Sequence, residues 1–242
     1  MTPPARPASP LTGDELPRVR TPLPGPRAQA LVEDLAASEC PGLTARRQRR
    51  AEAAGAPHDP IVWQAARGAV VRDVDGNVYL DMTAGFGAAL IGHSHPHVLQ
   101  ALGTQAASLL HALGDVYPSA PKIALQQRLA ALAPWPARVI LGLSGSDAVE
   151  AALKTARLHT GRPGVLAFVG GYHGLSYGPL AACGYQEAFR RPFADQLNPP
   201  AQIVPSPRVL HPAPRAAARC ARASLDAVGR VLAAGRTGAV LI

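Results

Sequence analysis

A glycine- and serine-rich stretch, GLSGS at residues 142–146, has the composition and spacing of an anion-binding turn. It follows an apolar run at residues 139–141, which predicts a buried strand. Ser144 and Asp147 have capping-box spacing, so we expect a helix to begin here. The first N–H groups of a helix lack internal partners and lie at its positive end, which favours a phosphate. For this stretch taken alone, a capped turn without a ligand is the alternative.

A second candidate is the sequence YHG at residues 172–174, which follows a predicted strand at residues 164–169. Ligands of open α/β sheets bind at the carboxyl ends of the strands. The Tyr172 ring and the His173 imidazole therefore either face a ligand or pack against the sheet.

Three alternating histidines, His93, His95 and His97, are a third candidate. On a strand they would share one face and could bind a metal ion. Pro96 fits the first turn of a following helix, which would break that geometry, and the sequence offers no cysteine or carboxylate beside them. We therefore predict polar contacts at a helix start and no metal site.

Strand-like and helix-like apolar patterns alternate along the chain, which predicts an α/β protein. An Asp-Gly turn at residues 75–76, between apolar residues, predicts a β-hairpin over residues 69–82. A further strand is predicted from residue 238 to the end of the chain, whereas residues 185–215, with many prolines and arginines, are predicted to be irregular. The predicted helices cover residues 28–38, 43–55, 97–113, 119–133 and 216–235.

The 242-residue chain has a net charge of +8 that comes almost wholly from arginine. One arginine cluster, residues 46–50, has no interleaved aromatic residues, so we expect a solvated helix face and no nucleic-acid binding. No apolar run reaches the length of a membrane span, and the N-terminus lacks the apolar core of a signal peptide. Three widely spaced cysteines favour a reducing compartment, the cytoplasm.

Both ends of the chain are unusual. Residues 1–27 are rich in proline, which predicts a mobile or surface-draped arm without a packed core. The chain stops inside its last apolar run, at Ile242, where an unfinished parallel sheet would have an open edge. We therefore expect the sequence to be the N-terminal part of a longer protein, or a truncated gene product.

Three segments in the same order resemble the class III pyridoxal-phosphate-dependent aminotransferases of fold type I. They are DVDGNVYLDMTAGFGAALIGHSHPHV at residues 73–98, SGSDAVEAALKTAR at residues 144–157 and FVGGYHGLSYGPLAACG at residues 168–184. The resemblance implies an incomplete α/β fold with a mostly parallel sheet and flanking helices. It implies a proline-rich arm and short helix (1–40), part of a small domain that contains the hairpin (41–92) and a truncated cofactor-binding domain (93–242).

The resemblance also implies roles for single residues. Gly145 and Ser146 would hold the phosphate of pyridoxal 5'-phosphate, Tyr172 would stack on its ring and His173 would line the same pocket. Phe86 would lie near the substrate, and the family works as homodimers with active sites at the interface. The full-length protein would transfer an amino group between an amine or amino acid and a 2-oxo acid, through pyridoxamine phosphate.

Two positions depart from the family pattern, and two residues are missing. Leu175 stands where members that act on ω-amino acids often have arginine, which argues against a carboxylate clamp there, and Asp147 replaces the usual glutamate. The Schiff-base lysine and the aspartate that pairs with the pyridine nitrogen are expected beyond Ile242. Neither Lys122 nor Lys154 can substitute, so we expect this chain alone to be inactive.

Two other functions remain as alternatives. The chain could be a non-catalytic remnant, or a regulatory partner, that keeps this fold without its chemistry. More remotely, residues 142–146 are close to the Gly-x-Ser-x-Gly turn of α/β-hydrolases, with Ser144 as nucleophile and Asp195 and His211 downstream. The fifth position is serine instead of glycine, and no oxyanion-loop motif precedes it.

Overall fold

The structure is a computed structural model that describes residues 9–55, 60–207 and 214–242. The chain divides into two compact units between Ala112 and Leu113, each with its own three-stranded sheet. The sheet of the second unit is parallel and lies between helices, which confirms the predicted α/β class. The domain boundary that we place between residues 92 and 93 stays a prediction.

The first unit is built on an antiparallel sheet of order β1-β2-β3. The predicted hairpin is confirmed, with Val70 opposite Leu80 and Arg72 opposite Val78. The remaining strand of this sheet, β1, was not predicted, because its sequence WQAAR lacks a clear alternation of apolar and polar residues. The elements are α1 (Pro26–Ser38), α2 (Pro41–Ala54), β1 (Trp63–Arg67), β2 (Val70–Asp73), β3 (Val78–Leu80) and α3 (Pro96–Ser108).

The hairpin turn holds the start of α1. The two carboxylate oxygens of Asp75 accept the N–H groups of Arg27 and Ala28, both at 2.9 Å. These are orphan donors of the first helical turn, and the capping residue Gly25 contributes no side-chain hydrogen bond of its own. A Cβ atom on Gly25 would collide with the Asp75 carboxyl group. Glycine therefore permits a cap that comes from a residue far away in the sequence.

A buried polar network lies beneath the same turn. The Asp73 carboxylate accepts hydrogen bonds at 2.8 Å from the Asn77 side-chain amide and from the Tyr79 hydroxyl, and both Asp73 and Asn77 are fully buried. Burial and this carboxylate raise the pKa of Tyr79 to about 12. Because a buried polar group without a partner is costly, these bonds define one arrangement of the turn.

The described part of the proline-rich arm, residues 9–27, packs more closely than the sequence predicts. The Asn77 side-chain oxygen accepts the N–H groups of Arg20 at 2.6 Å and Thr21 at 3.1 Å. Leu11 is 6% exposed and belongs to one core cluster with Val70 and Val78. The expectation of an arm without a packed core is therefore wrong for this segment, because the hairpin offers it both an apolar face and a hydrogen-bond acceptor.

The second unit contains the parallel sheet, of order β5-β4-β6. Most of its predicted helices and strands are confirmed within a few residues. Its elements are α4 (Ala120–Ala131), α5 (Gly145–Thr160), β4 (Gly164–Phe168), α6 (Tyr177–Ala181), α7 (Glu187–Arg190), η1 (Arg191–Phe193), β5 (Ala201–Val204), α8 (Pro214–Ala233) and β6 (Thr237–Val240).

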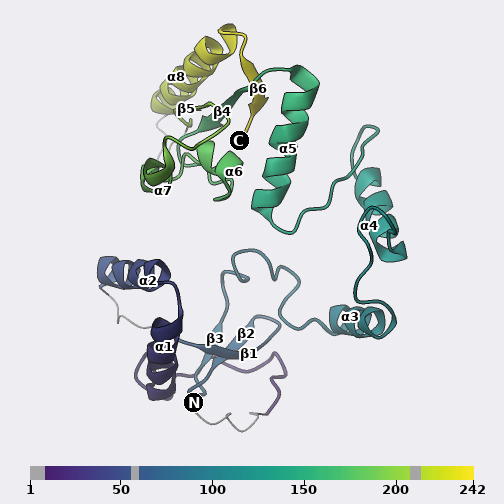
Figure 1. Ribbon diagram of the computed structural model, residues 1–242. Coiled ribbons are helices and arrows are strands. Elements are labelled where there is room, and N and C mark those ends of the chain that lie inside the picture. The colour runs from purple at the N-terminus through teal and green to yellow at the C-terminus, as the bar shows by residue number, and fades with distance from the viewer. Residues whose placement is uncertain (1–8, 56–59, 208–213) are drawn as a thin grey trace. The chain divides into compact units, whose positions relative to one another are not determined.

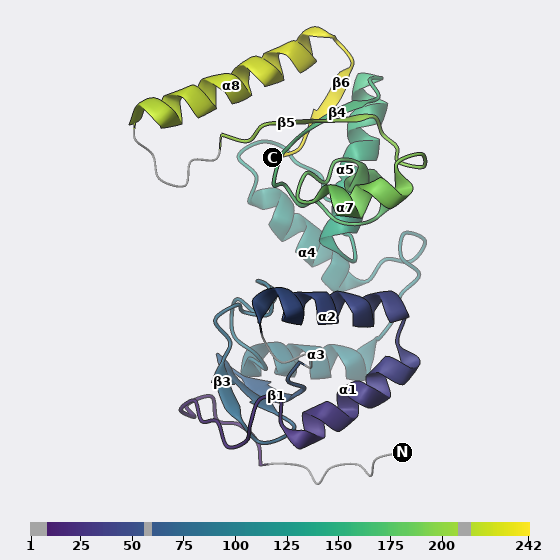
Figure 2. The ribbon, with the colours of Figure 1, turned by 90° about the vertical axis from the view of Figure 1, so that its left-hand side faces the viewer.

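Helices α5 and α8 cover opposite faces of this sheet, as Figures 1 and 2 show. Successive residues of β4 alternate between the two faces. Val165 packs in the cluster that contains Leu153 of α5. Leu166 packs on the other side, in the cluster that contains Ala227 of α8. The result is a three-layer arrangement in which both faces of the central strand are buried.

Two predictions about strands in this unit were wrong. Residues 139–141 form no strand among the described residues, and Ile140 is 71% exposed. A strand needs a hydrogen-bonded neighbour, and no described strand lies beside this run. Conversely, β5 lies in the segment 185–215, which we expected to be irregular, because prolines on both sides obscure its four residues.

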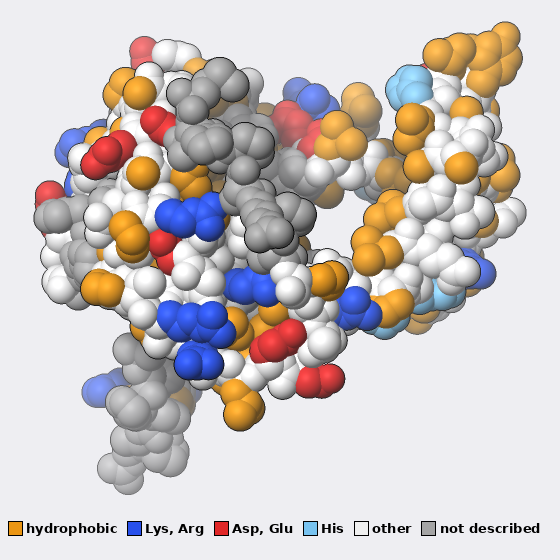
Figure 3. All heavy atoms as spheres, turned by 90° about the horizontal axis from the view of Figure 1, so that it is seen from below, with side chains coloured by type: hydrophobic (Ala, Val, Ile, Leu, Met, Phe, Trp, Pro, Cys, Tyr) orange, Lys and Arg blue, Asp and Glu red, His pale blue; other side chains and the backbone are white. Residues whose placement is uncertain are grey.

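Large hydrophobic side chains are exposed in the loop 82–91 and along α3. Orange side chains interrupt the polar surface on the face that Figure 3 shows. No helix in the described ranges is both long enough and apolar enough to span a membrane. The exposed residues of the loop and α3 are Met82, Phe86, Leu90, Ile91, Val98, Leu99 and Leu102.

Removing the Asp75 carboxylate tests the cap on α1. We expect Asp75→Ala to lower the free energy of unfolding by about 1–2 kcal/mol, because two N–H groups lose their acceptor. Asp75→Asn keeps one acceptor oxygen and should recover only part of the loss, because its amide nitrogen cannot accept the second N–H. Urea unfolding of the three chains measures the effect, and equal loss in both variants would contradict the capping role.

Candidate functional site

Helix α5 begins where the capping spacing predicts. The Ser144 hydroxyl accepts the N–H of Asp147 at 3.1 Å, and the Asp147 carboxylate accepts the N–H of Leu143 at 2.9 Å. The return bond therefore reaches one residue further back than in a standard capping box. Together these bonds hold the turn before the helix in one conformation.

The N-terminus of α5 leaves donors free. Among the described residues, the N–H groups of Gly145 and Ser146 have no hydrogen-bond partner, whereas that of Ala148 donates to the Ser144 carbonyl at 3.0 Å. A Cβ atom on Gly145 would meet nothing within 4 Å, so its backbone faces open space. Two free donors at the positive end of a 16-residue helix suit a phosphate.

The loop after β4 approaches this helix start very closely. Gly174 has φ +121°, and a Cβ atom there would lie 2.5 Å from the Ser146 hydroxyl oxygen. Only glycine fits this backbone conformation and this separation. Two residues later, the Ser176 N–H donates to the Ser146 hydroxyl at 3.2 Å, and the two serine hydroxyls are hydrogen-bonded to each other.

These segments together line one open depression of about 650 Å³. It lies beyond Phe168, the carboxyl end of β4, where ligands of α/β sheets bind. The structure thus brings together the four residues predicted to bind the cofactor, although they come from two separate segments. The lining residues are Ser144, Gly145, Ser146, Val149, Tyr172, His173, Gly174, Leu175 and Ser176.

Tyr172 is 56% exposed, and its ring contacts other aromatic residues. It meets the Tyr185 ring edge to face at a centroid distance of 6.2 Å, and Tyr185 stacks on Phe189. A supported ring with an exposed face can stack on a flat ligand. Sequence reasoning missed Tyr185, because nothing in its local sequence indicates that contact.

The imidazole of His173 lines the depression but is partly buried. Burial lowers the pKa of His173 below its ordinary value, so the neutral form is favoured. Its Nε2 atom is buried beside Gly171 and has no hydrogen-bond partner among the described residues. A buried nitrogen without a hydrogen-bond partner destabilises the folded chain. Such a nitrogen is expected where a ligand supplies the missing partner.

The remaining candidates do not lie in this depression. Phe86 belongs to the other unit, is 98% exposed and has φ +57°, so its predicted role near the substrate stays a prediction. The Lys122 amine donates to the Gly114 carbonyl at 2.9 Å, and the Lys154 amine pairs with Glu150 at 3.5 Å. Neither lysine lines the depression.

Ser144, the serine of the hydrolase alternative, acts as the α5 cap. Its suggested partner His211 lies outside the described residues, and Asp195 does not line the depression. The described residues therefore show no catalytic arrangement of these three side chains.

The three histidines do not form a metal-binding cluster among the described residues. His93 Nε2 lies 2.8 Å from an Asp81 carboxylate oxygen, and Pro96 starts α3 as expected. The prediction that no carboxylate stands near them was wrong, because the loop between Asp81 and His93 turns back on itself. Hydrogen bonds from Thr83 and His93 hold the pKa of Asp81 well below its usual range. In the part of the chain that is described, no three potential metal ligands cluster.

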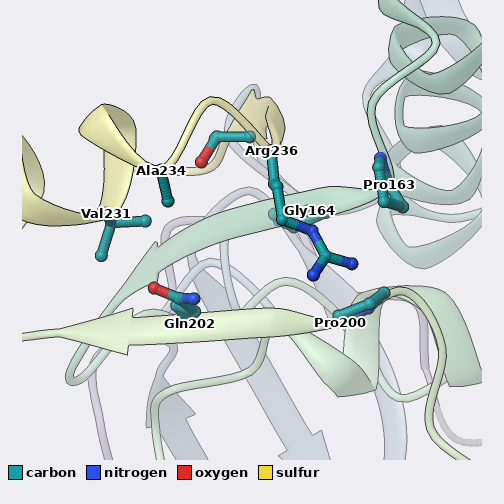
Figure 4. Close-up of a pocket in the computed structure, with 9 residues that line it drawn as sticks. Pro163, Gly164, Pro200, Gln202, Val231, Ala234 and Arg236 are labelled. Carbon is teal, nitrogen blue, oxygen red and sulfur yellow. The ribbon is translucent and has the colours of Figure 1, made fainter.

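A second hollow lies at the opposite, amino-terminal edge of the parallel sheet. Figure 4 shows it between β4, β5 and the segment that follows α8, with the Arg236 side chain extended across it. Because ligands of such sheets bind at the carboxyl edge, the depression at Ser146 is the better candidate site. The labelled residues of this hollow are Pro163, Gly164, Pro200, Gln202, Val231, Ala234 and Arg236.

Comparison with known proteins gives one consistent result. The sequence model of the family described as Aminotransferase class-III matches residues 51–242. An alanine/serine racemase from Pyrococcus horikoshii is 33% identical over 80% of this chain and 38% of its own length. A 4-aminobutyrate aminotransferase from Mycobacterium bovis is 33% identical over 74% of this chain and 41% of its own length.

A solved structure shares the fold. The taurine:2-oxoglutarate aminotransferase from Bifidobacterium kashiwanohense, in complex with PLP and glutamate, superposes with a TM-score of 0.68 and 25% identity. The match covers 75% of this chain and 42% of that one. The chain thus spans about two fifths of the length of the proteins that it resembles.

Alanine at Gly174 tests the close approach to Ser146. We expect Gly174→Ala to lower the free energy of unfolding by about 2–4 kcal/mol, from positive-φ strain plus the collision with Ser146. Gly161 also has positive φ (+68°) but has nothing within 4 Å of an added Cβ, so Gly161→Ala should cost only about 1–2 kcal/mol. Equal losses in denaturant unfolding would contradict the contact.

The stability of the chain should depend on pH through His173. The folded-state pKa is lowered, so the unfolded chain takes up a proton that the folded chain resists. This share of stability is complete above about pH 6.5 and is lost as the pH falls below that value. We expect His173→Gln to flatten the decline in the urea midpoint towards pH 5, whereas His159→Gln, at an exposed position, should not.

Proposed function

Because this chain belongs to the class III aminotransferase family, we propose that its depression at Ser146 holds pyridoxal 5'-phosphate. The phosphate would lie at Gly145 and Ser146, and the ring beside Tyr172 and His173. One observation carries the proposal. Two pairs of adjacent residues, Gly145 and Ser146 and then Tyr172 and His173, about 26 positions apart in the sequence, line a single depression at the carboxyl edge of the sheet.

The residues fit a phosphorylated cofactor in their chemistry. Two free N–H groups and the Ser146 hydroxyl supply donors, and the positive end of α5 supplies a favourable potential. Gly145 leaves room for a phosphate to approach the backbone. The donors are built into a capped helix, so little conformational entropy is lost when they bind.

Pyridoxal phosphate, when bound, supplies an electron sink that the amino-acid side chains lack. The residues of this chain would bind and orient it. The Ser146 hydroxyl and the α5 N–H groups would hold the phosphate, and Tyr172 would restrict the ring to one plane. His173, in its neutral form, would line the pocket without adding a positive charge. Lys122 and Lys154 are the only lysines in the sequence and bond elsewhere, so the residues that act at the reactive end would come from beyond this chain.

For the whole protein we propose transfer of an amino group between an amine or amino acid and a 2-oxo acid. The 4-aminobutyrate aminotransferase supports this reaction class. Leu175, which lines the depression, offers no charge to a substrate carboxylate. We therefore expect the substrate to be held by groups elsewhere.

Amino-acid racemisation is a second candidate. The alanine/serine racemase from Pyrococcus horikoshii aligns with 80% of this chain, a larger share than the aminotransferase from Mycobacterium bovis. Both reactions need the same phosphate site. Product analysis of the whole protein separates them, because only amino transfer consumes a 2-oxo acid.

The remaining family properties are proposals of the same kind. A homodimer, with Phe86 near the substrate, would cover the apolar loop 82–91 and α3, whose exposure supports an interface there. The cysteines Cys40, Cys183 and Cys220 are free, which supports a reducing compartment, the cytoplasm.

Binding of the cofactor to this chain tests the proposed function. We expect saturable binding of pyridoxal phosphate in equilibrium dialysis, competition by inorganic phosphate, and at least about tenfold weaker binding of pyridoxal, which lacks the phosphate. Tyr172→Ala should weaken binding about 2- to 12-fold through loss of stacking. Tyr117→Ala removes an exposed tyrosine of the same unit outside the depression and serves as the control.

A covalent readout accompanies this measurement. At stoichiometric cofactor we expect no borohydride-trapped adduct on Lys122 or Lys154 and no absorbance band near roughly 410–420 nm. A trapped lysine would contradict the assignment of the reactive end to residues outside this chain. Equal affinity for pyridoxal and pyridoxal phosphate would contradict the phosphate site itself.

A further inference from the structure

Ser176 lies at the edge of the depression and has two contacts with Ser146. Its N–H donates to the Ser146 hydroxyl oxygen at 3.2 Å, and its own hydroxyl is hydrogen-bonded to the same oxygen. Both residues line the depression, although they are 30 positions apart in the sequence. Ser176 therefore acts directly on a residue that we assign to the phosphate.

The hydrogen-bonding capacity of a hydroxyl group limits what Ser146 can do. Its oxygen has two lone pairs and one proton. When the N–H and the O–H of Ser176 both donate to it, both acceptor positions are filled. The Ser146 proton is then the one part of the group still free to bond, and it can serve only as a donor to a further acceptor. A phosphate oxygen above the free N–H groups of α5 is such an acceptor.

We propose that Ser176 is a positioning residue that makes the Ser146 hydroxyl an obligatory donor to the cofactor phosphate. This inference rests on the proposed function. Without Ser176, the Ser146 hydroxyl could rotate and could also present a lone pair to the anion, which is repulsive. The Ser176 hydroxyl further polarises the Ser146 group, because hydrogen bonds in a chain strengthen one another.

The surrounding contacts hold Ser176 in place. Gly174 lets the loop approach Ser146, where any larger residue would collide. The next residue, Tyr177, donates its hydroxyl to the Gln196 side chain at 2.7 Å, and its ring contacts Phe193 at a centroid distance of 5.9 Å. The neighbours of Ser176 on both sides are thus held by contacts of their own. Little conformational entropy is therefore lost in fixing Ser176 against Ser146 when the anion binds.

A double-mutant cycle tests this role, with pyridoxal phosphate, inorganic phosphate and pyridoxal as probes in equilibrium dialysis. We expect Ser176→Ala to weaken pyridoxal phosphate about 3- to 10-fold, and Ser146→Ala at least as much. The double variant should match Ser146→Ala within about twofold, because Ser176 acts through Ser146. Inorganic phosphate should follow the same pattern, and pyridoxal should bind all variants equally.

Matched variants separate this role from a structural one. Ser176→Thr keeps the hydroxyl and should bind as the unsubstituted chain does, whereas Ser176→Val, of the same shape, should bind as Ser176→Ala does. This pair decides the question if Ser176→Ala does not fold. Ser119→Ala removes the serine that caps α4, outside the depression, and should leave binding unchanged.

Three outcomes would overturn the inference while leaving the proposed function intact. They are unchanged affinity in both Ser176→Ala and Ser176→Val, independent losses that multiply in the double variant, and an equal loss for pyridoxal. Failure of the unsubstituted chain to bind pyridoxal phosphate would instead refute the proposed function, and this role of Ser176 with it.

Discussion

The contact between Gly174 and Ser146 is the constraint on which the candidate site depends. It brings the loop after β4 against the first turn of α5, so that the start of this helix and the Tyr172 ring line one depression. A side chain at residue 174 would push these segments apart, and Ser146 would lose its bonds to Ser176. The geometry of the depression thus depends on the absence of a single Cβ atom.

In the first unit, too, a glycine permits a close contact between segments that are distant in the sequence. The Asp75 side chain reaches the start of α1 because Gly25 has no side chain to block it. Asp73 and Asn77, buried under the same turn, connect the hairpin to the N-terminal arm. A short Asp-Gly-Asn sequence therefore organises a helix, a sheet and an extended segment, because the side chains of Asp75 and Asn77 have hydrogen-bond partners outside the turn.

The proposed cofactor site is lined by residues of the second unit alone. The described depression suits the phosphate and ring of a cofactor, and its donors are preorganised by caps and loop contacts. It contains no lysine, so its contribution is binding and orientation. In our proposal this segment therefore binds and orients the cofactor, and residues outside it act at the reactive end.

Local patterns in the sequence determined most of the secondary structure and the identity of the candidate residues. Capping at Ser144, the hairpin turn at Asp75 and the helix start at Pro96 are short-range effects, so the sequence predicts them. Tertiary structure decided the rest. The run 139–141 has apolar residues but no strand beside it among the described residues, and β5 forms because β4 offers it a partner. Asp81 beside His93, Tyr185 beside Tyr172 and Ser176 on Ser146 depend on contacts between residues distant in sequence, which no local pattern encodes.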